Sequence, residues 1–400
     1  MNTEQYLFEN DINITSNNDI IDFGPLYKSA GFTSFINKKT LAMHLIETTK
    51  SSQFAPMPDA DVTDEYGNTI AYYFVKYLHM LPPASYLPNP MHKNKSGETL
   101  AHMWCREIGT IPPESIMISP NAITNHGDIL ATCYVKKARS IPPLELIPRG
   151  NAFTDSMKYN LWETLIIVLQ RKLPSMTIPQ SWYPNPSYVP NFGDPTLAMI
   201  YIRFAKTIPP HYLMHSSLIR DIDGNTMLMY FAEFGQYDLI PKSMTHSSNM
   251  QNNQGKTASM IWMESRHTIP PAILHANPYI QDYKGKTQLM YFIEHTPRAE
   301  NFADIPERFI HSLAIQDKNR HSVAHYCISN YNNIPSWICK GYFSEDVIHE
   351  QDSDGNTLAM YWILQTRRVN VPTFLLYNTQ KFHILNKHGQ SLLELIAAYT

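Results

Sequence analysis

The amino-acid sequence predicts an all-α fold, a repeat solenoid of about 11–12 short helix-turn-helix units. The first observation is a motif in which Asp or Asn is followed by two variable residues, Gly, one further residue, Thr and an apolar run. The second is a proline mark, Ile-Pro-Pro or a single Pro, that follows each copy. The third is the spacing, because the Thr position recurs every 29–35 residues. The clearest copies are DEYGNTIAYYF (64–74), NKSGETLAHMW (94–104), DIDGNTMLMYF (221–231), NNQGKTASMIW (252–262), DYKGKTQLMYF (282–292) and DSDGNTLAMYW (352–362).

Each position of the motif has a physical role. Gly gives the turn a backbone position with positive φ, and the side chain of the preceding Asp or Asn closes the turn. Thr is expected to cap the following helix, because its hydroxyl accepts a hydrogen bond from a free backbone N–H of the first helical turn. The motif therefore predicts a tight turn that leads directly into a helix.

The apolar run after Thr is long enough for two or three helical turns, and its fifth position is nearly always large. We expect this column to be buried between neighbouring repeats; it consists of Phe74, Trp104, Tyr134, Tyr201, Phe231, Trp262, Phe292 and Trp362. The prolines are predicted to start a second helix, since proline is tolerated at the first helical position. Segments such as PPHYLMH and PPAILHA allow at most about two turns, too few to be stable without neighbours.

The order of turn, Gly-x-Thr, helix and shorter second helix resembles the ankyrin repeat. The His of that family's Thr-Pro-Leu-His signature is matched by His102 and His325. The chain departs from the family by lacking the signature Pro after Thr and by placing Ala where Leu is expected, as at Ala71 and Ala359. The resemblance covers residues from about 35 to 400, and it implies a stack of helix pairs that binds proteins through its loop tips and concave face. A solenoid of the tetratricopeptide kind is the alternative architecture.

The repeat phase divides the chain into four parts. We predict an N-terminal extension or cap (1–34), a first repeat block (35–172), a Pro- and aromatic-rich joint or loop (173–195) and a second block with a C-terminal cap (196–400). Solenoids need caps because their end repeats would otherwise expose apolar core. Since the repeats take up nearly the whole chain, no remaining segment is large enough for a separate catalytic domain.

Composition limits the classes of partner and compartment. Charged residues make up 17% of the chain, the net charge is −3, and no cluster of Lys and Arg is long enough to follow a nucleic-acid backbone. The four cysteines form no CxxC pair, which is typical of reduced thiols. Neither a secretory signal nor an apolar stretch of membrane-spanning length is found. We therefore expect a cytoplasmic protein, in the host cytoplasm if the source is a virus or a parasite, with no nucleic-acid and no membrane partner.

Few residues are candidates for chemistry. No P-loop, dinucleotide fingerprint or nucleophile elbow occurs. Two His pairs, His211 with His215 and His321 with His325, have the spacing of metal ligands on one helical face, but the sequence fixes no third ligand. His also suits helix C-termini, where it caps free carbonyl groups. The sequence thus predicts no catalytic residue, no bound metal and no cofactor, and hence no enzyme.

The segment LPSMTIPQSWYPNPSYVPNFGDP (173–195) breaks the repeat rhythm. Its prolines surround four aromatic residues, Trp182, Tyr183, Tyr188 and Phe192. Exposed aromatic side chains on a stiff loop resemble the hot spots of protein interfaces. The alternative is a joint between two repeat blocks in which these aromatic side chains are packed down.

The predicted function is that of a non-enzymatic protein-binding scaffold, adaptor or inhibitor. The two residues between Asp/Asn and Gly vary freely, so we expect them to project at loop tips along one edge. We predict that a protein partner contacts the tip residues Tyr66 and Tyr283 together with Trp182, Tyr183, Tyr188 and Phe192 of the Pro-rich loop. Two alternatives stay open: a structural subunit built permanently into a larger assembly, and a metal-binding protein that uses the His pairs.

Overall fold

The computed structural model describes residues 38–52, 57–117, 119–214, 218–234, 240–295, 305, 307–335, 338, 348–376 and 383–400. Within these ranges the chain has 13 α-helices and, apart from three isolated β-bridges, no extended strand, so the predicted all-α class is confirmed. Contacts divide the chain into two compact units, Met1–Pro190 (unit 1) and Asn191–Thr400 (unit 2). The predicted N-terminal extension, 1–34, lies outside the described residues, and the unit boundary falls within the segment 173–195.

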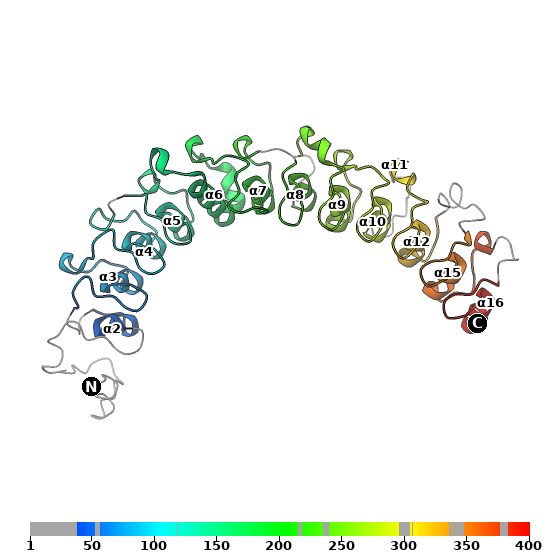
Figure 1. Ribbon diagram of the computed structural model, residues 1–400, viewed down its shortest axis with the longest axis horizontal. Coiled ribbons are helices and arrows are strands. Elements are labelled where there is room, and N and C mark those ends of the chain that lie inside the picture. The colour runs from blue at the N-terminus through cyan, green and yellow to red at the C-terminus, as the bar shows by residue number, and fades with distance from the viewer. Residues whose placement is uncertain are drawn as a thin grey trace, which may run out of the picture. The chain divides into compact units, whose positions relative to one another are not determined.

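Each unit is a row of short helices in chain order (Figure 1). Unit 1 contains α2 (Leu41–Thr49), α3 (Ile70–Tyr73) continued by a π-helical turn (Phe74–Leu78), α4 (Leu100–Glu107), α5 (Leu130–Ala138) and α6 (Asp155–Leu169). Unit 2 contains α7 (Leu197–Ala205), α8 (Met227–Phe234), α9 (Ala258–Arg266), α10 (Gln288–His295), α11 (Glu307–Ile310), α12 (Val323–Tyr331), α15 (Leu358–Thr366) and α16 (Leu392–Tyr399). None of the described helices is both long and apolar enough to cross a membrane.

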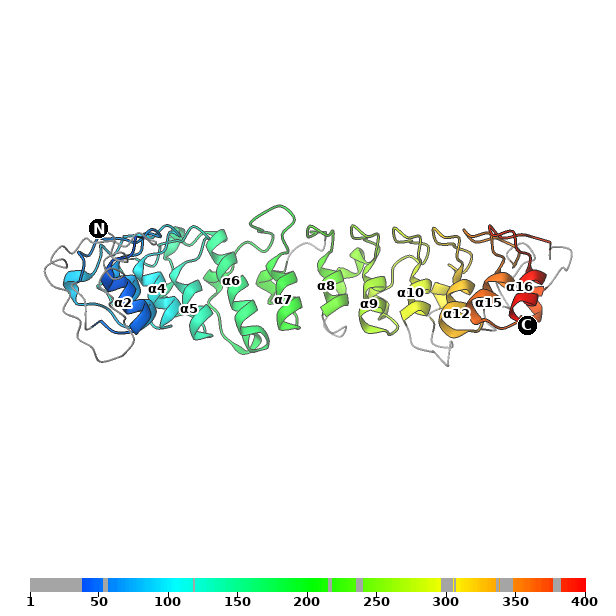
Figure 2. The same cartoon turned by 90° about the horizontal axis from the view of Figure 1, so that it is seen from below.

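Within each unit, the helix that follows one turn motif packs against the helix that follows the next. In unit 2 this sequence of contacts runs from α7 through α8, α9, α10, α12 and α15 to α16, and Figure 2 shows these helices side by side. One apolar core extends through the row from α9 to α16, where it includes Met260, Phe292 and Leu395. Short helices that would be marginal alone are therefore stabilised by their neighbours.

Thr and Ser start the helices, as the motif predicts. At Thr196, Thr257 and Thr357 the hydroxyl oxygen accepts a hydrogen bond from the backbone N–H three residues later. Thr99 and Ser322 have His at that later position, and the ring Nδ1 of His102 or His325 accepts the backbone N–H of the cap residue. Each of these two caps is therefore reciprocal, and both histidines are buried.

Most of the described proline marks are followed by a short 3₁₀ segment, so the prediction of a second α-helix is wrong for these copies. Examples are Ala84–Tyr86, His211–Leu213 and Ala272–Leu274. The second proline precedes the turn, with an extended ψ of 149° at Pro83, and its carbonyl accepts the N–H three residues later. After those three residues the chain turns into an extended conformation, which leaves no room for an i to i+4 hydrogen bond. Pro306 is instead followed by the four-residue helix α11, and the 3₁₀ segment after Pro241, Lys242–Ser247, has six residues.

The third residue after these prolines is buried in the core in most copies. The buried residues are Ile116, Leu146, Trp182, Leu213, Met244, Leu274, Phe309, Ile338 and Leu375. The large residue five positions after Thr is also buried in most copies, with Trp262 exposing 6% of its surface, while Trp104 and Tyr134 are half-buried. The expectation that this aromatic column packs between neighbouring segments is therefore confirmed for most of its members.

The glycines of the turn motif have positive φ, as predicted. Their φ values lie between 73° and 91° at Gly67, Gly97, Gly127, Gly193, Gly224, Gly255, Gly285, Gly355 and Gly389. Conformation is only part of the requirement, because the turns also pack closely on one another. A Cβ on Gly285 would lie 2.7 Å from the backbone nitrogen of Lys318 in the next turn. Glycine is thus required both for its backbone angles and for its lack of a side chain.

Candidate protein-binding surface

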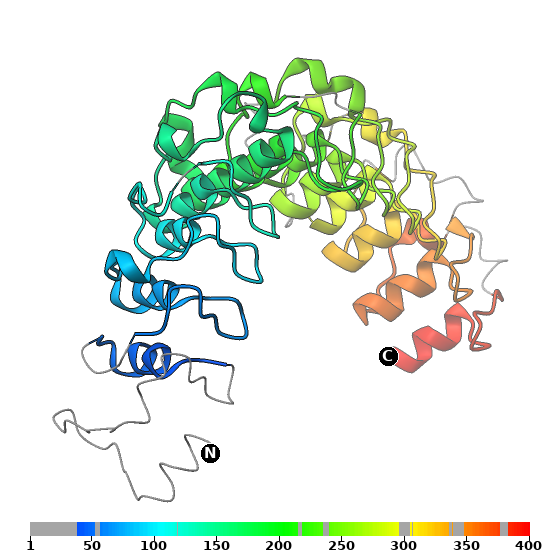
Figure 3. The same cartoon turned by 60° about the vertical axis from the view of Figure 1, so that its left-hand side comes forward.

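The turns of neighbouring segments are joined through their backbones. Tyr283 N donates to Gln254 O at 3.0 Å, and Lys318 N donates to Lys284 O at 2.9 Å. We call this series of hydrogen bonds the turn ladder; its other members are Lys95 to Tyr66, Asn125 to Ser96, Asn253 to Asp223, Ser353 to Asn319 and Lys387 to Asp354. In each unit the turns project beyond the helices, as Figure 3 shows. The ladder holds the backbone of each tip in place, so its side chains have a defined direction.

A buried carboxylate closes several of the turns. Oδ1 of Asp282 accepts the backbone N–H groups of Lys284 and Lys286 at 2.9 and 2.7 Å, and Oδ2 accepts the phenol of Tyr291 at 2.9 Å. The same Asp–Tyr hydrogen bond joins Asp64 to Tyr73, Asp221 to Tyr230 and Asp317 to Tyr326. Burial and the adjacent carboxylate raise the pKa of all four phenols well above the usual range, so each phenol stays a neutral donor.

This pairing has a signal in the sequence that the turn motif described above does not include. Every turn that begins with one of the paired Asp residues has Tyr nine residues later, and so does Asp352 with Tyr361. Where the turn begins with Asn or Thr, the ninth residue is apolar: Met103 after Asn94, Cys133 after Thr124, Ile261 after Asn252 and Leu395 after Asn386. The physical reason is that a buried carboxylate oxygen needs a donor, whereas an amide supplies its own.

The Asn turns satisfy their amides by bonding backwards along the row. Asn252 Nδ2 donates to Asn225 Oδ1 of the preceding turn at 2.9 Å, and Asn225 Nδ2 donates in turn to Asp221 Oδ2 at 3.2 Å. The same relay recurs at Asn94 with Asn68 and at Asn386 with Asn356. Side chains therefore reinforce the backbone ladder between consecutive turns.

Ion pairs fasten five of the described turns to the helices that follow them. The residue just before Thr pairs with the residue eight positions later, as Lys256 does with Glu264 at 2.6 Å and Lys286 with Glu294 at 2.7 Å. The charges are reversed in two copies, Glu98 with Arg106 and Asp128 with Lys136, and the fifth copy is Lys39 with Glu47. The two positions stay oppositely charged even where the signs are reversed, which indicates that the ion pair has a structural role. These side chains are therefore already paired within the fold.

The tip side chains are exposed, in contrast with the buried residues on either side. Tyr66 exposes 53% of its surface and Tyr283 exposes 63%, and Ile222 in the equivalent turn exposes 74%. The preceding Asp64, Asp221 and Asp282 are buried. The expectation that the two variable residues project at the tips is therefore confirmed for most turns of both units, whereas Glu65 and Ser353 are half-buried.

Trp182 is not the exposed anchor that was expected, because it exposes only 3% of its surface. Gln180–Trp182 is the 3₁₀ turn that follows Pro179, and Trp182 occupies the buried third position of that turn. Trp162 of α6 donates its indole N–H to the Trp182 carbonyl at 3.0 Å and packs against the Tyr183 ring with centroids 4.5 Å apart. Tyr188 packs edge-on against Tyr159 of the same helix. These three aromatic residues cover α6 within unit 1.

Phe192 differs from the other aromatic residues of this segment. It belongs to unit 2 and its side chain is fully exposed. It precedes Gly193, which lies against the Ile222 backbone, so Phe192 stands at the tip of the first turn of the unit. Of the aromatic side chains predicted to contact a partner, Tyr66, Tyr283 and Phe192 are presented at tips, whereas Trp182, Tyr183 and Tyr188 are packed against α6.

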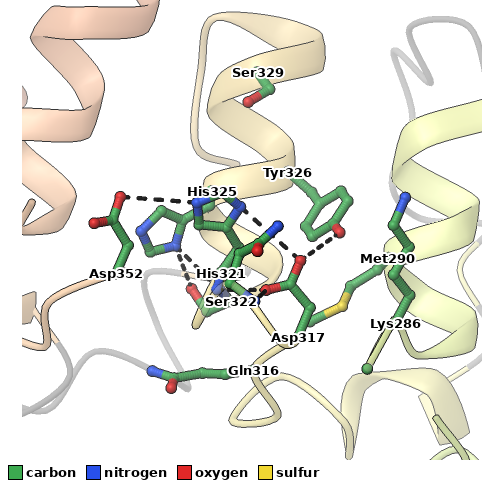
Figure 4. A network of polar contacts seen from close by, with 12 residues as sticks. Lys286, Met290, Gln316, Asp317, His321, Ser322, His325, Tyr326, Ser329 and Asp352 are labelled. Carbon is green, nitrogen blue, oxygen red and sulfur yellow. Dashed lines mark hydrogen bonds and ion pairs between the residues drawn. The ribbon is translucent and has the colours of Figure 1, made fainter. Parts of the chain in front are cut away.

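A hollow of about 500 Å³ lies beside the tips in unit 2. The exposed tip residues Tyr283, Lys284 and Lys318 form part of its lining, and His325, Tyr326 and Tyr361 contribute from α12 and α15. Figure 4 shows the polar network next to it. Tyr361 is the exception to the Asp–Tyr hydrogen bonds described above, because its phenol bonds to Ser329 Oγ at 2.7 Å instead of to Asp352.

His321 lies between two carboxylates in this network. Its Nδ1 is 4.0 Å from Asp317 Oδ2 and its Nε2 is 3.7 Å from Asp352 Oδ2 (Figure 4). Burial by itself raises the pKa of the Asp352 carboxyl, but contacts with His321, Asn356 and the Asp354 backbone lower it to about 2. Asp352 is therefore ionised in the folded protein throughout the ordinary pH range.

His325 stacks on His321, with ring centroids 5.0 Å apart. Burial, and then the neighbouring His321, lowers its pKa to about 3, so the ring is neutral. Because Nδ1 accepts the Ser322 N–H at 3.1 Å, we assign the ring proton to Nε2. In the equivalent His102, Nε2 contacts the Ala122 carbonyl at 3.2 Å. In His325, Nε2 has no hydrogen-bond partner among the described residues.

The His pairs do not build a metal centre in the described part of the chain. No group of three or more His, Cys, Asp or Glu side chains there could hold a metal ion. Of the first pair, His211 packs against Tyr212, and His215 lies outside the described residues. Of the second pair, His325 uses its Nδ1 in a helix cap, so its arrangement is explained by the start of α12.

Comparisons with known proteins add little to this geometry. No protein-family model matches the chain, and no curated protein matches it. Among solved structures, a chain in a complex of the Bd0816 predatory endopeptidase from Bdellovibrio bacteriovorus with immunity protein Bd3460 is similar over 43% of this chain and 91% of its own length. The sequence identity is 17% and the TM-score is 0.30, a likeness too low to carry an argument about repeat type or function.

Proposed function

We propose that the chain is an ankyrin-like α-solenoid and a non-enzymatic protein-binding scaffold, adaptor or inhibitor that contacts its partner through the turn tips. The observation that carries this proposal is the contrast within each turn. In the turn at Asp282, for example, the ladder and the buried Asp282 fix the backbone, while the next two side chains, Tyr283 and Lys284, are exposed. Because the backbone of such a surface is already fixed, little conformational entropy is lost when its variable side chains bind a partner.

Tyrosine at a tip is well suited to recognition. Its ring offers a large apolar area and its hydroxyl can donate or accept a hydrogen bond, and it loses little conformational entropy on binding. Tyr66 in unit 1 and Tyr283 in unit 2 are the exposed tip tyrosines among the described turns, and Phe192 adds an exposed aromatic tip in unit 2. Each is a candidate hot spot worth about 2 kcal/mol of binding free energy.

The cysteines support a reducing compartment, and we propose the cytoplasm. Cys105 and Cys133 are free and buried. Burial raises the pKa of Cys133 to about 12, so this thiol stays protonated and unreactive. Reduced, inert thiols of this kind are typical of intracellular proteins.

A permanent structural subunit is the second candidate, and exposed apolar side chains away from the tips favour it. Met80, Met91 and Leu144 expose 51%, 55% and 66% of their surfaces. In an obligate assembly such residues would be covered by a neighbouring subunit. Gel filtration of the purified chain separates the two candidates, since an obligate subunit alone would aggregate or form oligomers.

The proposal is tested by quantitative co-purification from the source cell. The Tyr66→Ala/Tyr283→Ala double variant should retain less than about one tenth of the partner, because the loss of one hot spot reduces affinity about thirtyfold. Tyr279→Ala is the matched control, since Tyr279 exposes 58% of its surface outside the tips. Thermal unfolding of both variants should match that of the parent. Full retention of the partner by the folded double variant would contradict the proposal.

A further inference from the structure

The hollow of unit 2 contains charges that the fold does not use. Lys286 is held by both carboxylate oxygens of Glu294 at 2.7 and 2.8 Å. Lys284 and Lys318 are exposed and form no ion pair with any described residue. The ladder bond from Lys318 N to Lys284 O places these two lysines on adjacent tips. Two lysines without an ion-pair partner among the described residues therefore line one hollow from adjacent tips.

The charge balance of the lining is positive. Three lysines, Lys284, Lys286 and Lys318, are opposed by two carboxylates, Glu294 and Asp317, and both carboxylates already have partners. The whole chain, in contrast, has a net charge of −3. The hollow is therefore a locally positive site on a weakly acidic protein, and its excess charge is carried by the two tip lysines.

The two tip lysines determine the chemistry of the ligand. Their ammonium groups favour a ligand that is negatively charged and rich in acceptor oxygens. His325 also lines the hollow, but its Nε2 is fully buried and has no hydrogen-bond partner among the described residues.

We propose that this hollow binds an acidic peptide segment of the protein partner, with Asp or Glu carboxylates held by Lys284 and Lys318. The inference rests on the proposed function and names the chemistry of the partner at the same tips. A hollow of about 500 Å³ has the size of a ligand pocket and exceeds the volume of one carboxylate, so it can accommodate several peptide residues. The exposed Tyr283 ring, next to Lys284, offers an apolar surface for the stem of an acidic side chain.

The pattern along the tips favours a peptide over a nucleic acid. A phosphate backbone is followed by cations repeated along a groove. The neighbouring tips interrupt any such track with Asp223, Gln254, Ser353 and Asp354. Two lysines bounded by neutral and acidic tips fit a short stretch of carboxylates instead. Acidic residues in the partner would also be steered to this site at low ionic strength.

Fluorescence anisotropy with purified full-length protein tests the proposal. The probes are fluorescein-labelled hexaglutamate, hexaglutamine and a single-stranded thymidine hexamer, at low salt. Hexaglutamate should bind at least tenfold more tightly than either other probe, and salt should weaken its binding. The Lys284→Glu/Lys318→Glu variant should weaken hexaglutamate binding at least tenfold. The Lys95→Glu/Lys387→Glu variant reverses two exposed tip lysines outside the hollow and should change it less than twofold.

Three outcomes would overturn the proposal: equal binding of hexaglutamate and hexaglutamine, equal or tighter binding of the oligonucleotide, or equal losses in the two charge-reversed variants. Far-UV circular dichroism checks that all variants are folded. The result is independent of the co-purification experiment. If the Tyr66/Tyr283 variant loses its partner while hexaglutamate fails to bind, the proposed function stands and only the acidic-peptide inference fails.

Discussion

The turn ladder predicts that two glycines with the same backbone conformation tolerate substitution very differently. Gly285 has φ +83°, and a Cβ there would lie 2.7 Å from Lys318 N and 2.9 Å from Asp317 Cα. Gly389, in the last turn, has φ +73° and no atom within 4 Å of the added Cβ. Both substitutions to Ala incur the strain of positive φ, about 1 kcal/mol. Only Gly285→Ala also pushes the next turn away.

The additional loss at Gly285 follows from the ladder. Moving the Lys318 backbone far enough to relieve the contact breaks its 2.9 Å hydrogen bond to Lys284 O, which contributes about 1 kcal/mol. Displacement of the buried Asp317 turn adds a comparable amount. We therefore expect Gly389→Ala to lower the free energy of unfolding by about 1 kcal/mol and Gly285→Ala to lower it by about 3 kcal/mol.

Urea unfolding followed by circular dichroism measures these totals, and amide hydrogen exchange measures the ladder bond directly. Exchange of the Lys318 amide should speed up at least tenfold in Gly285→Ala and stay unchanged in Gly389→Ala. Asn tolerates positive φ better than Ala, so Gly389→Asn should be nearly neutral, whereas Gly285→Asn should stay as destabilised as Gly285→Ala. Equal destabilisation by the two Ala substitutions, with unchanged exchange at Lys318, would refute the ladder.

Three further predictions concern stability. Tyr291→Phe should cost about 1–3 kcal/mol because it leaves Asp282 Oδ2 buried without its donor, and a double-mutant cycle with Asp282→Asn should give a coupling energy of at least about 1 kcal/mol; a coupling of zero refutes the pairing. Trp182→Ala should cost about 3–5 kcal/mol and Phe192→Ala less than about 0.5 kcal/mol in thermal or urea unfolding, so equal losses contradict the packing of Trp182 on α6. The pKa values of His102 and His325 are lowered to about 4 and about 3, mainly by burial. Because the unfolded chain binds protons that these folded histidines exclude, stability should fall as pH drops below about 6.5, by about 2 kcal/mol per histidine at pH 5. His325→Gln should lessen the pH dependence of the urea midpoint, and an unchanged dependence would show that His325 titrates normally.

The features that sequence predicts correctly are those set by local backbone constraints. Asp, Gly and Thr of a motif such as 282–287 lie within six residues, and each has one dominant structural use there: turn closure, positive φ and helix capping. Such short-range preferences are nearly independent of the rest of the chain. The turns and helix starts were therefore predicted at nearly the correct residues.

The prediction of an exposed Trp182 is wrong because its position after Pro179, and not the composition of the segment, determines its burial. A Pro-rich segment with aromatic residues resembles an exposed binding loop, and this resemblance suggested an interface. Aligning Pro179-Gln-Ser-Trp182 with Pro271-Ala-Ile-Leu274 places Trp182 in the column of buried third residues. In both of these segments the helical turn ends after three residues, as a single 3₁₀ turn.

The Asp–Tyr pairs and the turn-to-helix ion pairs could have been found as correlated choices nine and eight residues apart. The hollow in unit 2 could not have been found from the sequence. It depends on Lys284 and Lys318 being brought together across 34 residues by the turn ladder, and on Tyr361 bonding to Ser329 instead of Asp352. These contacts require the three-dimensional spacing of α10, α12 and α15, which no local pattern encodes.

Site-specific photocrosslinking in the source cell shows whether a protein partner binds at the turn tips. A benzophenone amino acid is introduced at Tyr66, a tip that exposes 53% of its surface, or at Leu144, which exposes 66% of its surface beside Pro143 in the same unit. Both positions are accessible and neither supports the core. We expect a discrete crosslinked protein from position 66 and none from position 144. Crosslinking from position 144 alone would contradict this expectation and would favour a subunit packed through its apolar surface.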